Sequence, residues 1–300
     1  MATHHAAPVL ALSTHLADRP NTRGIISKDI TSPLVTLNIC GPASVAKGFK
    51  PLVRDGAFDA SELSLITYLQ ARAHGKPLVL LPAVVLGRFQ HGYLAVRADS
   101  PITHPRQLQG LRVGIRSYTV TTATWARAIL EMQYGVDIDR ITWVTHEDSH
   151  LAEFVDPPNV TRIDLGGRTP EEMLAAGDLD AAVLGRPVSD PALRTLFADP
   201  MRAAQDWYDR FGALQVNHMV VVNAALSAER PDVVREIYRM LKQAAAAAPR
   251  SELGLDALPF GVEANRRNLE IAISAAHQQG LIPRAFHVDE LFDETTLALN

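Results

Sequence analysis

Hydrophobic residues along this chain form short strand-like runs that alternate with stretches of helical spacing. Dense or alternating apolar runs predict strands, and apolar residues three or four positions apart predict amphipathic helices. The predicted strands are residues 9–13, 34–39, 78–85, 93–96, 111–115, 141–145, 160–165, 181–185 and 217–222. Helices are predicted at 42–53, 65–74, 170–176 and 262–279, within 190–211, and from Ser227 through an alanine run to residue 248, with Pro231 in the first turn of that last helix. This alternation predicts an α/β protein with mostly parallel sheets flanked by helices.

Residues 111–125 form the most informative stretch. Val113 and Ile115 alternate as in a strand, a polar turn rich in hydroxyls follows, and a helix begins near Thr121. Trp125 then starts the helix's apolar spacing, so it is predicted to lie in the core, and Gly135 is placed to end the helix in a left-handed conformation. A helix N-terminus has unpaired N–H groups and the positive end of the dipole, so this turn suits a carboxylate or phosphate. An ordinary capped strand–helix junction would look the same.

Composition narrows the class of protein. The chain has 300 residues, 47% of them hydrophobic and 21% charged, with a net charge of −4. Because no basic block is present, nucleic acid is not expected as a partner. A single cysteine, Cys40, rules out an internal disulfide.

Targeting signals are weak. No run approaches the roughly 18 apolar residues of a membrane span. The first eight residues lack a positively charged region, and the apolar run at 9–12 is too short for a signal peptide. The sequence therefore predicts a soluble, cytoplasmic protein without a membrane partner.

Several segments resemble known proteins. The segment PRQLQGLRVG (105–114) is similar to the P-x-x-L-x-G-x-x-V-G pattern of type II periplasmic-binding-protein folds. FDASELS (58–64), RFQH (88–91), GIRSYTVTTATW (114–125), YGV (134–136) and ITWV (141–144) together resemble the 4,5-dihydroxyphthalate decarboxylase family. The resemblance runs from about residue 10 to residue 242.

The resemblance implies two lobes, each a mostly parallel sheet flanked by helices. Lobe one would hold residues 1–96 and 217–300, and lobe two residues 97–216. A ligand would bind in the cleft between them, at loops that follow the strands.

The implied reaction assigns tasks to residue types. A ring hydroxyl para to the departing carboxylate supplies electrons, and the ring carbon must be protonated before CO2 leaves. Proton transfer calls for histidine or a carboxylate, and binding the acid calls for arginine and hydroxyl groups. The catalytic candidates are His91, His218 and Glu62, and the substrate-binding candidates are Arg88, Arg186, Ser61, Ser117, Tyr118, Thr119, Thr121, Thr122 and His15.

Each candidate also has a structural interpretation. The histidines would be hydrogen-bonded core residues, Glu62 a helix cap, and the arginines surface residues. No metal-binding histidine spacing and no glycine-rich nucleotide loop occurs, so neither a metal site nor a cofactor is predicted.

The sequence thus predicts a decarboxylase, cofactor-independent or metal-assisted, for a hydroxylated aromatic dicarboxylate such as 4,5-dihydroxyphthalate. The alternative is an ABC-transporter-type solute-binding protein that captures a small anion. A third interpretation is another enzyme on this fold, related to menaquinone-pathway or thiamine-precursor enzymes. The sequence leaves open whether the protein forms a homo-oligomer.

Overall fold

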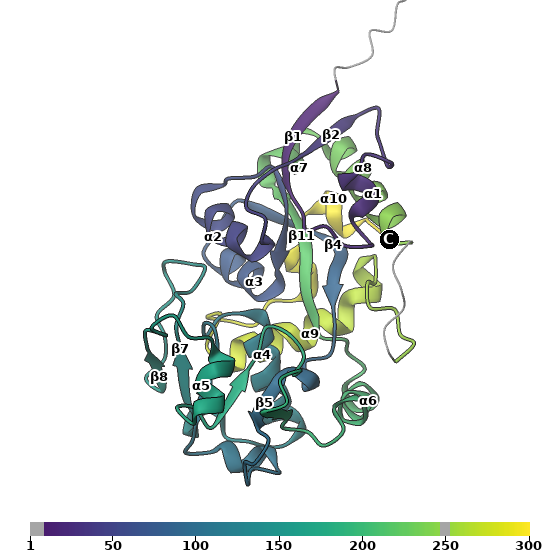
Figure 1. Ribbon diagram of the computed structural model, residues 1–300. Helices are drawn as coiled ribbons and strands as arrows, with labels where there is room; N and C mark the ends of the chain where they lie inside the picture. Colours follow the sequence, from purple (N-terminus) through teal and green to yellow (C-terminus); the bar gives the residue numbers. More distant parts are fainter. Residues whose placement is uncertain (1–8, 247–252) are drawn as a thin grey trace, which may run out of the picture. The chain divides into compact units, whose positions relative to one another are not determined.

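The computed structural model describes residues 9–246 and 253–300 (Figure 1). The His4–His5 pair and the end of the alanine run at 247–248 lie outside the described residues. The chain divides into two compact units. Unit 1 comprises Met1–Gly87, His218–Glu270 and Phe286–Asn300, and unit 2 comprises Arg88–Asn217 and Ile271–Ala285. The changeover at 87/88 precedes the lobe boundary expected after residue 96, and unit 2 includes 271–285, which the sequence analysis placed in lobe one.

Unit 1 is built on a five-stranded sheet. Its order is β2-β1-β3-β11-β4, formed by Val35–Ile39, Leu10–His15, Ala60–Ser64, Val216–Asn223 and Leu78–Gly87. Strand β1 runs parallel to β2 and β3, whereas β11 runs antiparallel to β3. The carboxyl ends of β1 and β3 therefore lie at the same sheet edge as the start of β11.

Helices of unit 1 bury apolar faces against this sheet. They are α1 (Arg23–Ile26), α2 (Val45–Asp55), α3 (Leu65–Ala73), α7 (Ala224–Glu229), α8 (Pro231–Ala245) and α10 (Glu294–Leu297), with a 3-10 turn at Val288–Leu291. Helix α8 contributes Val234, Ile237 and Leu241, at helical spacing, to a core shared with β1, β2, β4 and β11. The single helix predicted from Ser227 is wrong: α7 ends at Glu229 and Pro231 starts α8, because the residue before a proline is disfavoured in helical conformation.

Unit 2 is built on a six-stranded sheet. The order is β10-β5-β9-β6-β7-β8, formed by Leu193–Thr195, Leu94–Arg97, Ala181–Val183, Arg112–Gly114, Thr142–Thr145 and Val160–Arg162. Strands β9, β6, β7 and β8 are parallel, whereas β5 is antiparallel to both of its neighbours. Both units thus confirm the predicted α/β class with helix-flanked, mostly parallel sheets.

Each of the first three helices of unit 2 follows a strand along the chain after a short connecting segment. They are α4 (Thr121–Ala128), α5 (Pro170–Ala176) and α6 (Pro200–Phe211), with 3-10 turns at His91–Tyr93, Pro105–Leu108 and Ile138–Arg140. A π-helical turn, Ile129–Gln133, extends α4. Gly135 follows it with a φ of 64°, which is the left-handed conformation that the sequence predicted. The helical prediction across 190–211 is partly wrong, because residues 193–195 pair with β5 as strand β10. Helix α9 (Val262–Gln278) contributes residues to both units.

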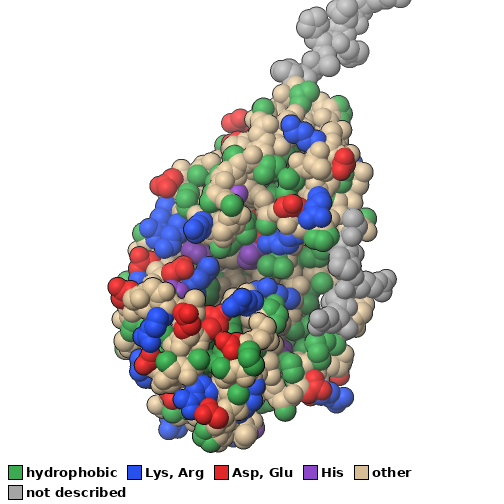
Figure 2. Space-filling model, viewed as in Figure 1, with side chains coloured by type: hydrophobic (Ala, Val, Ile, Leu, Met, Phe, Trp, Pro, Cys, Tyr) green, Lys and Arg blue, Asp and Glu red, His purple; other side chains and the backbone are tan. Residues whose placement is uncertain are grey.

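Trp125 is fully buried, which confirms its predicted place in the core. No helix in the described part of the chain combines the length and apolar character required to cross a bilayer. On the face seen in Figure 2, Lys and Arg side chains are interspersed with Asp and Glu.

Candidate functional site

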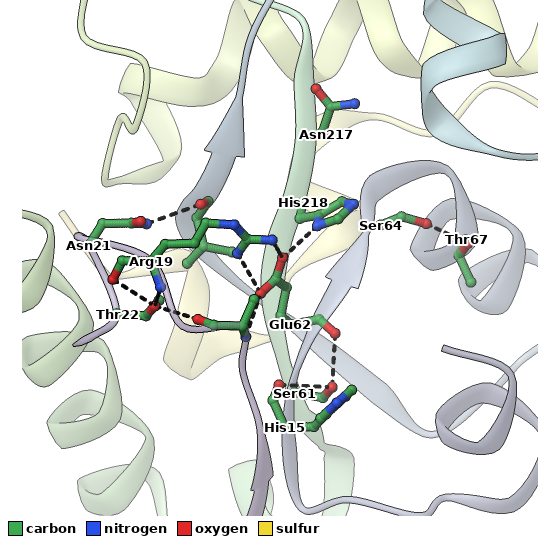
Figure 3. Close-up of polar contacts among 12 residues, drawn as sticks. His15, Arg19, Asn21, Thr22, Ser61, Glu62, Ser64, Thr67, Asn217 and His218 are labelled. Carbon is green, nitrogen blue, oxygen red and sulfur yellow. Dashed lines mark hydrogen bonds and ion pairs between the residues drawn. The ribbon is translucent and has the colours of Figure 1, made fainter. Parts of the chain in front are cut away.

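A carboxylate–imidazole pair lies in unit 1, on strands β3 and β11. The antiparallel register sets Glu62 opposite Val220 and His218 opposite Ser64, so Glu62 and His218 are diagonal neighbours on one face. His218 Nδ1 lies 2.5 Å from Glu62 Oε1, within charge-assisted hydrogen-bond distance (Figure 3). The Glu62 side chain is 0% exposed, whereas that of His218 is 15% exposed. Part of the His218 side chain is therefore open to solvent, while the carboxylate is shielded from it.

Arg19 completes this cluster from the segment after β1. Its two terminal nitrogens contact the two carboxylate oxygens of Glu62: Nη1 donates to Oε2 at 2.8 Å, and Nη2 lies 2.7 Å from Oε1. The backbone N–H of Ala17 also donates to Oε2, at 3.1 Å. Thr22 holds the loop in shape, because its hydroxyl accepts from the Arg19 N–H and donates to the Ala17 carbonyl. We call Glu62, His218 and Arg19 the carboxylate cluster.

The carboxylate cluster keeps Glu62 ionised. Burial by itself would raise the pKa of this carboxyl, because desolvation disfavours the charged form. Hydrogen bonds and charge interactions from His218 and Arg19 outweigh that effect and lower the pKa to about 2. Glu62 is therefore a fixed anion at neutral pH.

His15 and Ser61 lie on the other face of the same sheet. They pair directly in the parallel β1–β3 register, one position out of phase with Glu62 (Figure 3). His15 Nε2 donates to the Pro42 carbonyl at 3.0 Å, and the Ser61 hydroxyl bonds backbone carbonyls, including that of His15. The structure therefore separates these two substrate-binding candidates from the carboxylate cluster.

His91 lies in unit 2 among aromatic rings. Phe89, Phe197 and Trp207 have ring centroids within 6.4 Å of its own. His91 Nε2 is 2.9 Å from Gln133 Oε1; because the Gln133 amide nitrogen donates to a backbone carbonyl, that oxygen faces His91 as an acceptor. Burial lowers the pKa of His91 to about 4, so the ring is neutral at pH 7. This environment resembles that of a core histidine more than that of an acid working at neutral pH.

Arg88 is half-buried, with its guanidinium carbon 4.3 Å from the centre of the Tyr93 ring. Next to it, the Gln90 side-chain amide donates to Asn217 Oδ1 at 2.7 Å, and the Gln90 backbone N–H donates to Gln215 Oε1 at 2.6 Å. The buried amides tie residues 88–90 to residues 215–217 within unit 2.

The hydroxyl-rich turn before α4 forms as predicted. Ser117, Tyr118, Thr119 and Thr121 are buried, and Thr122 is half-buried. Thr119 Oγ1 donates to Ser149 Oγ at 3.1 Å, and the Tyr118 ring stacks on Phe154 at 6.3 Å. These five residues all belong to unit 2.

Arg186 lies on the surface of unit 2. Its side chain is 71% exposed and its Nε lies 3.4 Å from Glu171 Oε1. The structure thus does not bring Arg186 together with the turn before α4 in any described contact. A pocket of about 240 Å³ in unit 1, lined by residues that include Arg54, Asp55 and Lys76, contains none of the predicted site residues.

A metal site finds no support in the described residues. Across residues 9–246 and 253–300, no group of three His, Cys, Asp or Glu side chains lies close enough to hold an ion. The nitrogen of His218 that faces Glu62 is already hydrogen-bonded to it.

Sequence reasoning missed Arg19. It lies in a stretch, residues 17–32, that reads only as polar and rich in turn formers. The feature that could have identified Arg19 is its position, because it closely follows a predicted strand, where ligand-binding loops of α/β proteins occur. Gln90, Gln215 and Arg127 were missed as well, because a buried amide or guanidinium looks like a surface residue in sequence.

Two sheet-centred units with these strand orders define an α/β protein with a periplasmic-binding-protein-like fold. The structure is similar to that of the periplasmic aliphatic sulphonate binding protein SsuA from Escherichia coli, with a TM-score of 0.60, 12% identity and coverage of 96% of this chain and 93% of that chain. Residues 42–155 match a family described as the periplasmic substrate-binding protein of phosphonate ABC transporters.

The relatives that match by sequence carry a more specific description than the structural neighbour does. The chain is 27% identical to a 4,5-dihydroxyphthalate decarboxylase from Comamonas testosteroni, with 96% of each chain covered. It is 29% identical to a 4,5-dihydroxyphthalate decarboxylase from Pseudomonas putida, over 66% of this chain and 80% of the relative. These matches confirm the resemblance to the 4,5-dihydroxyphthalate decarboxylase family that the sequence motifs indicate.

Proposed function

We propose that this protein decarboxylates a hydroxylated aromatic dicarboxylate such as 4,5-dihydroxyphthalate. Two relatives carry that activity in their names, one of them over nearly the whole chain. The observation that carries the proposal is the buried Glu62 carboxylate bonded to the partly exposed His218. Such a pair is a general means of moving a proton.

In the proposed reaction, His218 donates a proton to the ring carbon that bears the departing carboxylate. The ring hydroxyl para to that carbon supplies the electrons, and loss of CO2 then restores the aromatic ring. The balance is one carboxylate and one proton consumed for one C–H bond and one CO2 formed. The reaction in this form needs no organic cofactor, and assays with and without a chelator test for assistance by a metal.

Glu62 and Arg19 serve His218 in this proposal. Glu62 stabilises the imidazolium and fixes the orientation of the ring, as a carboxylate behind a catalytic histidine does in other proteins. The Arg19 guanidinium is planar and contacts both oxygens, so it fixes the carboxylate plane. The hydroxyls of the turn before α4 are proposed separately, within unit 2, as contacts for a carboxylate.

Capture of a small anionic solute is the second candidate function. It is favoured by the match to a phosphonate-binding family over residues 42–155 and by the SsuA-like fold. Binding a small anion requires no proton donor, and fold alone does not assign function.

The test is release of CO2 from 4,5-dihydroxyphthalate, with product formation followed in parallel by absorbance. Wild type is compared with His218→Gln, Glu62→Gln and Arg19→Lys. Arg23→Lys is the matched control, because Arg23 lies four residues from Arg19 but pairs with the exposed Asp18. We expect turnover by wild type and by the control, and kcat lowered roughly 10²- to 10⁴-fold in His218→Gln.

Turnover that survives in a folded His218→Gln variant would contradict the assigned role of His218. Absence of turnover by wild type, together with thermal stabilisation by phthalate, would favour the solute-binding alternative, since stabilisation follows from binding alone.

A further inference from the structure

Arg127 is a fully buried cation in unit 2, with 0% of its surface exposed. It lies on α4 and packs its guanidinium 3.8 Å from the centre of the Tyr118 ring. Nη2 donates to the Tyr118 carbonyl at 2.7 Å, and Nε donates to Gln279 Oε1 at 2.8 Å. Within the described chain, no carboxylate forms an ion pair with this guanidinium, although a buried charge is costly without one.

Three buried polar atoms of unit 2 have no hydrogen-bond partner among the described residues: one on Arg127, one in the turn that follows β6 and one at the end of β7. They are Arg127 Nη1, Ser117 Oγ and Thr145 Oγ1. Ser117 follows β6 and Thr145 ends β7, and these parallel neighbours finish at the same sheet edge. Thr145 is two residues after Trp143, so its side chain lies on the same face as the Trp143 ring, which is 5.5 Å from the Arg127 guanidinium carbon.

We propose that Arg127 is a positioning residue that makes the turn at 117–122 a binding site for a carboxylate or similar small oxyanion, with the Ser117 and Thr145 hydroxyls as donors. The proposal rests on the proposed function in that the turn is taken to hold a substrate carboxylate. It adds two residues, Thr145 and Arg127, and an origin for the positive charge.

Charge and geometry support this assignment together. The first N–H groups of α4 and its dipole favour an anion at Thr121. Arg127 fixes the Tyr118 carbonyl that leads into this helix start, and it brings a full positive charge to the same turn. Burial lowers the pKa of Arg127 to about 10, so the side chain remains charged at neutral pH. An oxyanion would satisfy hydroxyls that are otherwise buried without partners, which is an unfavourable state.

The test uses phthalate as the probe and isothermal titration calorimetry on the full chain. Thr145→Val and Ser117→Ala each remove a hydroxyl that lacks a partner. We expect unfolding free energy that is unchanged or higher in both variants, and phthalate affinity about three- to tenfold lower. Thr195→Val is the control, because the Thr195 hydroxyl already donates to the Phe197 carbonyl; it should lose stability and keep its phthalate affinity.

Arg127 is tested with Arg127→Met and Arg127→Lys. We expect phthalate affinity at least tenfold lower in Arg127→Met and at least partial recovery in Arg127→Lys, which keeps the charge. If Arg127→Met does not fold, the phthalate affinities of Ser117→Ala and Thr145→Val test the proposal. Phthalate affinity within twofold of wild type in both folded hydroxyl variants would overturn the proposal.

The two proposals fail separately. Anion binding that depends on these residues without CO2 release would leave this inference standing and reject the decarboxylase. Turnover that requires His218, together with a phthalate affinity that is unchanged in the Ser117, Thr145 and Arg127 variants, would support the decarboxylase and reject this inference.

Discussion

His218 Nδ1 lies 2.5 Å from Glu62 Oε1, although the two residues are 156 positions apart in the chain. The contact exists because β11 returns to the first sheet antiparallel to β3, in a register that puts both side chains on one face. The same strand pairing sets His15 and Ser61 on the opposite face. Strand register thus decides which of the candidate residues lie together.

The first prediction concerns the energetic coupling of this pair. Glu62→Gln and His218→Gln should each lower kcat, but the double variant should be little worse than His218→Gln alone. The reason is that Glu62 acts through His218, and residues that act as a unit are not additive. A double-mutant cycle on kcat measures this; fully additive losses would contradict the arrangement.

A second prediction follows from the low pKa of Glu62. Its pKa is about 2 in the folded protein against an ordinary value of 4.5, so the stability it contributes is present above about pH 4.5 and is lost as pH falls toward 2. The shift of about 2.5 units corresponds to roughly 3 kcal/mol. Urea unfolding between pH 5 and pH 3 should show a steeper loss of stability in wild type than in Glu62→Gln. Parallel pH curves for the two proteins would count against an ionised, hydrogen-bonded Glu62.

His91 gives a third prediction with a different pH window. Burial lowers its pKa from 6.5 to about 4, so its contribution is present above about pH 6.5 and is lost as pH falls toward 4. His91→Phe retains an aromatic ring among Phe89, Phe197 and Trp207 and removes the titration. The difference in unfolding free energy between wild type and His91→Phe should therefore change by roughly 3 kcal/mol across this window. A constant difference would show that His91 titrates normally.

The fourth prediction concerns the packing of His15. A Cβ at Gly48, on α2, would overlap the His15 ring. Replacing a helical glycine by alanine normally stabilises a protein by up to about 1 kcal/mol. Gly48→Ala should instead destabilise by about 1–3 kcal/mol, because overpacking outweighs helix propensity. Chemical denaturation measures the change, and Gly48→Ala combined with His15→Ala should lose less stability than the two single changes added together. Gly56→Ala, whose Cβ would meet no atom within 4 Å but whose φ is +64°, reports separately the cost of backbone strain alone.

The sequence by itself determined the succession of elements and the class of fold. A dense apolar run located β4, and Pro170 with the two glutamates after it located α5. Helical spacing located α9 to within a residue, because burial of one face imposes a period on the residues. It erred at 190–211, where Leu193–Thr195 forms an edge strand, since three residues carry too little pattern to show a strand. It also named Glu62, His218 and the turn before α4 as chemically interesting, from residue type and position after strands.

Only the tertiary structure decided which of these residues meet. Sequence cannot give the antiparallel register of β11 on β3, which joins His218 to Glu62, or the loop that brings Arg19 to the same carboxylate. Nor can it distinguish the buried, neutral His91 from His218, which is hydrogen-bonded to a carboxylate, because a pKa depends on desolvation and on neighbours distant in the chain. Arg127 shows the same limit: the sequence gives its charge, but its burial against the Tyr118 and Trp143 rings arises only in the folded structure.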